Sequence, residues 1–269
     1  MTTMNAIAPA SERRLWRTVA VPSEHGGWGL TLEPVLLGLL IAPSVGGVVL
    51  GLAAFIAFLV RTPVKLALVD ARRGRWLDRS RLALRIALVE LAVIAGLVLI
   101  ALLASGRSWL IPVVVAAPLV GMELWFDVRS RGRRLVPELC GAMGIAAVAA
   151  VIVLAAGRSG VLAAGVWLVL AARSIGAVPF VRVQITRLHR GAGNSRSSDA
   201  AQVVAVALGA IAVAVDSRLL AALAGIVVLA MLQVWWTRRP PLPARVLGMR
   251  QMLLGVALVA VTAVGVLGS

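Results

Sequence analysis

Apolar runs of about twenty residues follow one another along nearly the whole chain, and this repetition limits the fold more than any other feature. An α-helix needs about 20 residues, within a range of roughly 17–25, to cross the hydrocarbon core of a bilayer. Only 14% of the residues are charged, whereas soluble domains carry about 25%. The sequence therefore predicts an all-α, polytopic membrane helix bundle with nine transmembrane helices. The nine runs cover residues 28–46, 47–69, 82–104, 108–126, 136–156, 160–181, 200–216, 218–236 and 246–267.

No polar stretch is long enough to fold by itself, so we expect residues 22–269 to form a single transmembrane helical domain. Residues 1–21 are interpreted as a cytoplasmic N-terminal tail. They contain arginines but lack the apolar core of a secretory signal peptide. We therefore expect the first membrane helix to act as an uncleaved anchor. The lone cysteine, Cys140, excludes an internal disulfide and is interpreted as a small core residue.

Lysine and arginine are distributed very unevenly between alternate connections. Of the 27 basic residues, 21 lie in the N-terminal tail and the even-numbered connections, and only three lie in the other connections. Basic residues collect in cytoplasmic loops of membrane proteins, so the asymmetry predicts a cytoplasmic N-terminus and an external C-terminus in the plasma membrane. The same rule accounts for the net charge of +16. The lipid bilayer is thus the expected partner, and we expect no nucleic acid.

Three titratable groups occur where the chain enters the first apolar run, in "PSEHGGWGLTLEP" at residues 22–34. Glu24 is placed to orient the ring of His25 and to raise its pKa. A helix cap with Ser23 at the N-cap position is the alternative. Because a cap requires neither His25 nor Glu33, we interpret Glu24 and His25 as a candidate catalytic acid/base pair and Glu33 as a candidate substrate-binding residue.

Arg173 lies midway along the sixth apolar run. A charge at this depth costs about 2.5–3.5 kcal/mol on the insertion scale, so it is expected to face a cavity or a carboxylate. Glu33 and Glu90 are the candidate ion-pair partners. We favour the cavity and count Arg173 among the substrate-binding candidates. Pro179 is expected to disturb the same helix.

The second apolar run ends in "RTPVKLALVD", which contains three further binding candidates: Arg61, Lys65 and Asp70. Arg61 and Lys65 are one helical turn apart and share a face. Pro63 lies between them and is expected to bend or break the helix, as in helices that line cavities. The alternative is an ordinary solvated helix end.

Two carboxylates, Glu123 and Asp127, close the fourth run with i,i+4 spacing and point the same way. Oxygen ligands on one face can hold a divalent cation. The same carboxylates can pair with Arg61, Lys65 or Arg173, and we favour that interpretation.

Arg182 is the basic residue nearest the membrane after the sixth run. All these groups belong to the predicted cytoplasmic halves of the first, second, fourth and sixth runs. We therefore expect one cytoplasm-facing cationic cavity that binds an anionic or phosphorylated lipid-like ligand, because arginine suits planar recognition of phosphate and carboxylate.

Two stretches, "VPSEHGGWGLTLEPVLLGLL" and "RTPVKLALVDARRGR", resemble the YwiC-like family of bacterial membrane proteins. The nine helices and the polar clusters after helices two and six look like the UbiA-type intramembrane prenyltransferases. That likeness implies a UbiA-like arrangement and transfer of an isoprenyl group from its diphosphate to an acceptor.

The sequence departs from the UbiA-type pattern where those enzymes hold magnesium. The corresponding regions offer Arg61, Lys65 and Asp70, then Arg173, Arg182 and Arg187, in place of the two Asp-rich motifs. We therefore carry over no metal ligand and expect no cofactor, with the cations meeting the phosphate directly.

Three functions remain open: a transferase that uses a phosphorylated isoprenoid or other lipid-like substrate, a transporter for an organic anion, and a non-catalytic scaffold. The substrate and the oligomeric state are not predicted.

Overall fold

The computed structural model describes residue 19 and residues 25–74, 76–129, 134–191 and 193–269, and these ranges contain helices and connections but no strand. Each of the nine apolar runs corresponds to one α-helix. The helices are α2 (His25–Ile41), α3 (Val45–Arg72), α4 (Asp78–Ala104), α5 (Leu110–Val128), α6 (Leu135–Ala155), α7 (Gly160–Arg190), α8 (Arg196–Val215), α9 (Leu220–Thr237) and α10 (Ala244–Leu267), with a 3₁₀ turn η1 (Ser217–Leu219) before α9.

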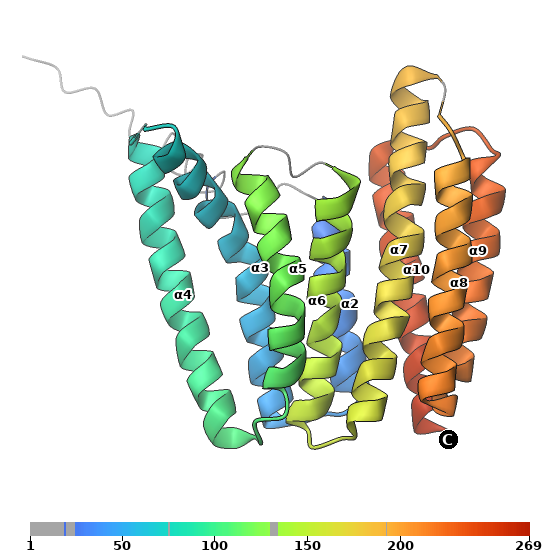
Figure 1. The fold of residues 1–269 in the computed structure, drawn as a ribbon, viewed down its shortest axis with the longest axis horizontal. Helices are drawn as coiled ribbons and strands as arrows, with labels where there is room; N and C mark the ends of the chain where they lie inside the picture. The colour runs from blue at the N-terminus through green and yellow to red at the C-terminus, as the bar shows by residue number, and fades with distance from the viewer. Residues whose placement is uncertain (1–18, 20–24, 75, 130–133, 192) are drawn as a thin grey trace, which may run out of the picture.

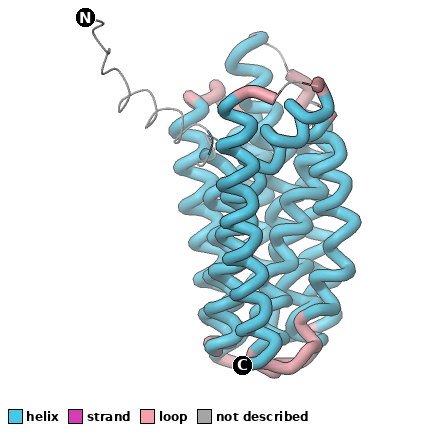
Figure 2. The backbone as a smooth tube through the Cα atoms, turned by 90° about the vertical axis from the view of Figure 1, so that its left-hand side faces the viewer, coloured by secondary structure: helices cyan, strands magenta, loops and turns pink. Residues whose placement is uncertain are grey.

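The helices stand side by side, and successive helices run in opposite directions (Figure 1). A view turned by 90° shows the connections gathered at the two ends of the bundle (Figure 2). The connections after α3, α5, α7 and α9 lie at one end, which we call the arginine-rich end. Those after α2, α4, α6 and α8 lie at the other, together with the C-terminus.

Eight helices, α3 to α10 with η1 joined to α9, are long and apolar enough to cross a membrane. The prediction of a polytopic helical bundle is therefore confirmed. The first helix is shorter than the predicted run of 28–46, because α2 ends at Ile41. Its 17 residues correspond to about 26 Å, slightly less than a hydrocarbon core of about 30 Å. Ser44 stops the run early, since its side chain accepts a hydrogen bond from the Gly47 N–H at 2.9 Å and begins α3.

Of the bend or break expected at Pro63, the break is wrong. α3 continues through Pro63, and α2 and α7 likewise continue through Pro34 and Pro179. A proline removes only its own backbone donor, and in membrane bundles the surrounding helices tolerate the local adjustment. In the described residues, these prolines therefore do not interrupt α2, α3 or α7.

The core lies where α6 and α7 pack against each other, with α2 packed on α6, α8 packed on α7, and buried side chains added by α9 and α10. Sixty-one per cent of the most apolar window of α6 is buried and 67% of that of α7, against 11% for α4. Alanine and glycine dominate the buried positions of α6, and such small residues let helix backbones approach closely in membranes. α4 packs mainly on α3 and turns large apolar side chains outward, as a helix facing lipid does.

Candidate functional site

Four of the predicted residues form one charged cluster between α3 and α5. The Arg61 guanidinium lies 2.7 Å from Glu123 Oε1 and 2.9 Å from Asp127 Oδ2, and Lys65 Nζ lies 3.0 Å from Asp127 Oδ1. Asp127 is buried, whereas about a third of each cationic side chain is exposed. The favoured interpretation, that the two carboxylates pair with Arg61 and Lys65, agrees with this geometry.

This cluster lies at the level where α5 ends. Asp127 is the penultimate residue of α5, while Arg61 precedes the end of α3 by eleven residues, or about 17 Å of helix. The 28 residues of α3 correspond to about 42 Å, more than a hydrocarbon core of about 30 Å. The charges that the sequence places deep in a membrane run therefore lie near the arginine-rich end.

Glu33 and Arg173 form a second group, enclosed between α2, α7 and α10. The Arg173 guanidinium lies 3.7 Å from Glu33 Oε1 and donates to the backbone carbonyl of Gln251 at 2.7 Å. Both charged side chains are at most 4% exposed. The structure thus pairs Arg173 with Glu33, one of its two candidate carboxylate partners.

The second group carries unused hydrogen-bonding capacity. Within the described part of the chain, Arg173 Nε and Nη1 and both amide atoms of Gln251 are buried and have no hydrogen-bond partner. Buried polar groups in proteins are nearly always paired with protein or water. This group therefore has donors left over for a small polar molecule or ion.

Asp70 belongs to a third group, between α3 and the start of α4. Its carboxylate accepts from the Ser80 hydroxyl at 2.6 Å and from Arg79 at 3.3 Å. Neither partner was predicted. The positions of Arg79 and Ser80 just after the connection would indicate contact with Asp70 only if α3 and α4 were already known to pack together.

Arg182 belongs to a fourth group, where it lies 2.7 Å from Glu138 Oε2 in the first turn of α6. Glu138 was also missed by the sequence reasoning. Two further contacts tie the same end of α7 to α9: the Gln184 amide donates to the Trp236 carbonyl at 3.0 Å, and Arg187 donates to the Thr237 carbonyl.

The structure says little about the predicted acid/base pair, Glu24 and His25. Glu24 lies outside the described residues, and His25 is described only as the first residue of α2. The described candidates thus lie in four separate groups: between α3 and α5, between α2, α7 and α10, between α3 and α4, and between α6 and α7. The structure brings Arg61, Lys65, Glu123 and Asp127 together and does not bring Asp70, Arg173 or Arg182 into that group.

A pocket of about 380 Å³ lies beside the first cluster, between α3 and α5. Apolar residues of both helices line it, and its charged lining residues are Arg72 and Arg129. Arg129 stacks 3.4 Å above the Trp125 ring, and Arg72 donates to the Val128 carbonyl at 3.4 Å. Sequence reasoning assigned neither arginine a role, because arginines at loop positions are also explained by membrane topology.

No three His, Cys, Asp or Glu side chains are grouped as metal ligands within the described ranges. The two carboxylates of the α3–α5 cluster are engaged by Arg61 and Lys65, which is an arrangement of ion pairs.

Comparison with known proteins gives one result. Searches of curated proteins and of solved structures found no match. A family model described as "YwiC-like protein" matches residues 21–155, half of the chain, from the segment before α2 to the end of α6. The matched part includes the α3–α5 cluster, its pocket and Glu33. This chain belongs to the YwiC-like family.

Proposed function

We propose that this protein binds a phosphorylated, lipid-like molecule at its arginine-rich end, between α3 and α5, and acts on it as a membrane-embedded transferase of UbiA-like arrangement. The observation that carries the proposal is the α3–α5 pocket, in which apolar walls and two guanidiniums lie beside a four-residue charge cluster. Apolar walls suit an isoprenoid or acyl chain, and guanidiniums suit its phosphate.

The spacing of residues along α3 supports a continuous binding surface. Arg61, Lys65, Leu68 and Arg72 follow one another at intervals of three or four residues, so they lie on one stripe of the helix. Leu68 and Arg72, nearer the C-terminal end of α3, line the pocket. Arg61 and Lys65, nearer the middle of the helix, belong to the charge cluster. A phosphate held by Arg72 and Arg129 would thus lie at one end of an α3 stripe that also carries Arg61 and Lys65.

The proposed reaction is transfer of an isoprenyl-type group. The bond between the allylic carbon and the diphosphate oxygen breaks, the acceptor forms a bond to that carbon, and the diphosphate leaves with its charge balanced by arginine and lysine. The acceptor gives up one proton, and His25, oriented by Glu24, is the proposed base. Arg173, Glu33, Arg182 and Asp70 remain proposed binding residues, in the three groups that lie apart from the α3–α5 cluster.

The distribution of basic residues supports an orientation with the arginine-rich end in the cytoplasm of a cell whose plasma membrane the protein spans. The substrate would therefore enter from the cytoplasmic leaflet.

The binding part of the proposal is tested by identifying the lipids that co-purify with the full-length protein. Extraction followed by mass spectrometry is expected to recover a phosphorylated lipid from the wild type, and much less from the Arg72→Gln/Arg129→Gln double variant. Arg190→Gln is a matched control, because Arg190 is exposed at the same end and does not line the pocket. Equal recovery from all three proteins would refute binding at α3–α5.

The catalytic part is tested separately. Purified protein, supplied with a phosphorylated isoprenoid and membrane extract as a source of acceptor, is expected to release diphosphate. His25→Ala should abolish that release without removing the co-purifying lipid. Release that is unchanged in His25→Ala would exclude His25 as the base.

Transport of an organic anion is a second candidate, and the buried Arg173 favours it, because its Nε and Nη1 lack partners in the described structure. Uptake of a radiolabelled anion that depends on Arg173, and persists in the Arg72→Gln/Arg129→Gln variant, would favour transport over the transferase.

A further inference from the structure

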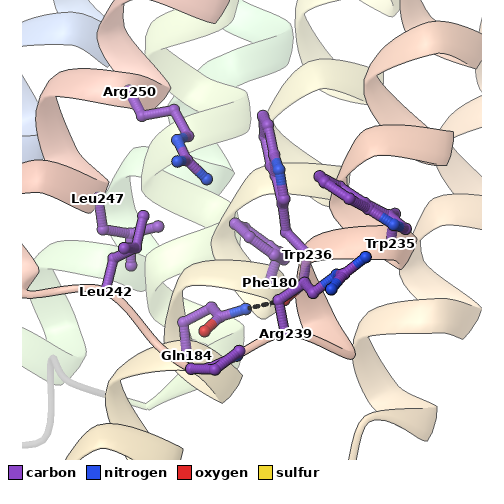
Figure 3. A pocket seen from close by; sticks show the side chains of 9 residues that line it. Phe180, Gln184, Trp235, Trp236, Arg239, Leu242, Leu247 and Arg250 are labelled. Carbon is purple, nitrogen blue, oxygen red and sulfur yellow. Dashed lines mark hydrogen bonds between the residues drawn. The ribbon is translucent and has the colours of Figure 1, made fainter.

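A second pocket, of about 220 Å³, lies between α7, α9 and α10 at the arginine-rich end. It is outside the part of the chain that the family model matches, and none of the residues predicted from the sequence as site residues lines it. Figure 3 shows Arg250 of α10 beside Trp236, Arg239 beside Trp235, and Gln184 of α7 below them.

The two guanidiniums are held by aromatic rings. The Arg250 guanidinium carbon lies 4.2 Å from the Trp236 ring centroid, and that of Arg239 lies 4.8 Å from the Trp235 ring centroid. Among the described residues neither arginine has a carboxylate within salt-bridge distance, and no acidic residue lines the pocket. The neighbouring Arg238, by contrast, pairs with Asp199. Stacking leaves the guanidinium edges, which carry the N–H donors, free for an anion.

Gln184 adds a buried acceptor to the same pocket. Its side chain amide donates to the Trp236 carbonyl at 3.0 Å, while its Oε1 atom is buried and has no partner in the described structure. The residue is only 3% exposed. A ligand that places a hydroxyl or N–H group beside its anionic group would satisfy this oxygen, since an unpaired buried acceptor costs free energy.

The other lining residues indicate how far into the bundle a ligand would reach. Phe180 and Leu247 are buried, and Trp235 is half-exposed at the rim. Tryptophan is enriched where membranes meet water. The volume suits a head group but not a long chain, so the tail of a lipid would lie outside the pocket, along α10 or α9.

We infer that this pocket binds a phosphate ester that also carries a hydroxyl or ammonium donor. Arg239 and Arg250 contact the phosphate, Gln184 accepts from the donor, and Trp235 and Trp236 hold the guanidiniums in place. The ligand is either the head group of an anionic phospholipid or a soluble phosphate ester, because the chemistry of the two is the same at this site.

The test uses full-length protein in nanodiscs of phosphatidylcholine with a minor fraction of phosphatidylglycerol, and counts retained lipids by native mass spectrometry. Arg239→Gln/Arg250→Gln is expected to bind phosphatidylglycerol at least about tenfold more weakly, since each change removes a charge-assisted contact. Arg245→Gln is the matched control, because Arg245 is exposed in the first turn of α10 and does not line the pocket. An equal loss in the control, or no loss in the double variant, overturns the inference.

Two further arms use the wild type alone, so they remain valid if a variant fails to fold. Phosphatidylmethanol has the same charge as phosphatidylglycerol but lacks its hydroxyl groups, and is expected to bind about fivefold more weakly, the value of one net hydrogen bond. Equal affinity for phosphatidylmethanol and phosphatidylglycerol would contradict the role of Gln184 as an acceptor for the ligand. Competition by sn-glycerol 3-phosphate assigns the site to a soluble ester, and binding of phosphatidylglycerol without that competition assigns it to a lipid. Binding of neither probe overturns the inference.

Discussion

At the scale of single residues, two glycines make room for carboxylates on facing helices. A Cβ atom added to Gly255 of α10 would overlap the carboxylate of Glu33, and one added to Gly141 of α6 would overlap that of Glu123. Neither glycine needs a left-handed backbone, since the described glycines with positive φ are Gly74, Gly157 and Gly191. Gly255 and Gly141 therefore act through close approach, which lets Glu33 reach Arg173 and Glu123 reach Arg61.

The first prediction is that Gly255→Ala destabilises the protein by about 1–3 kcal/mol, the usual cost of overpacking a close contact. In a Glu33→Ala/Arg173→Met background the same change should cost much less, because the overlapping carboxylate is gone. Thermal unfolding in detergent measures both differences. Gly96→Ala in α4 is the control, since nothing lies within 4 Å of its added Cβ. A cost that is equal in the two backgrounds would contradict the assigned contact.

The second prediction concerns Asp127, which receives hydrogen bonds from Arg61 at 2.9 and 3.2 Å and from Lys65 at 3.0 Å. Asp127→Asn should lower stability by about 1–3 kcal/mol, because the buried negative charge and one of the two oxygens that accept from Arg61 and Lys65 are lost. Asp78→Asn should have almost no effect, since the Asp78 side chain is fully exposed and 3.9 Å from Arg81. Unfolding curves in one detergent compare the two variants. If the two variants lose the same amount of stability, the ion pairs of the α3–α5 cluster do not stabilise the fold more than an exposed ion pair does.

At the scale of helices and turns, length decides where the polar groups lie. α3 and α7 have 28 and 31 residues, and both exceed the length that a hydrocarbon core of about 30 Å requires. Their surplus turns extend toward the arginine-rich end and carry Asp70, Arg182 and Gln184. The turns at the opposite end are short, and Ser159 and Asp216 cap the helices that follow them.

The third prediction uses Asp216, between α8 and η1. Its carboxylate accepts from the Arg218 side chain at 2.6 and 2.9 Å and from the Arg218 backbone N–H at 3.1 Å. These bonds, offset in part by burial, hold the pKa of Asp216 below its usual range. A carboxyl with a lowered folded pKa stabilises the fold above the unfolded value of about 4, and loses that contribution as the pH falls through the folded pKa.

Asp216→Asn should therefore reduce stability at pH 7 by about 1 kcal/mol, the usual value of a helix cap, and the difference from wild type should shrink below about pH 4. Melting temperatures between pH 7 and pH 3 test this. Asp199→Asn is the control, because Asp199 pairs with Arg238 through longer contacts of 3.3 and 3.4 Å. If the difference in melting temperature between Asp216→Asn and wild type does not depend on pH, the loss of stability does not come from the charge of Asp216.

At the scale of the whole molecule, the alternation of helix direction sorts the basic connections to one end of the bundle. That end also carries both described pockets, since each is lined by residues at or beyond the ends of α3, α5 or α9. The two pockets and most of the basic residues that predict the membrane orientation thus lie at the same end of the bundle.

The fourth prediction is that the arginine-rich end faces the cytoplasm. In a Cys140→Ser background, a membrane-impermeant maleimide should label Arg107→Cys in intact cells and Arg190→Cys only in inside-out vesicles. Both positions are exposed and lie at opposite ends. The reverse pattern would invert the topology, and labelling of both from one side would contradict the alternation of helices.

Sequence alone determined the fold class, the approximate positions of helices α2 to α10 and the end of the bundle at which the charges gather. Runs of about twenty apolar residues have few alternatives to spanning helices, because the backbone has no other way to satisfy its polar groups in lipid. The i,i+4 spacing also indicated that Glu123 and Asp127 would act together and would meet Arg61 and Lys65. The membership in the YwiC-like family followed from two local motifs in the same region.

Tertiary structure alone decided which charges pair and which remain available. Arg173 meets Glu33 on a helix far away in the sequence, whereas Asp70 meets Arg79 and Arg182 meets Glu138 across successive helices. Helix tilt and length set the depth of each side chain, so the depth of Arg61 could not be read from its position in an apolar run. Arg239 and Arg250 likewise look like ordinary loop and helix-end arginines until α7, α9 and α10 enclose them with two tryptophans and a buried amide. Ion pairing and burial depend on distances between helices, and a pattern along one chain does not contain those distances.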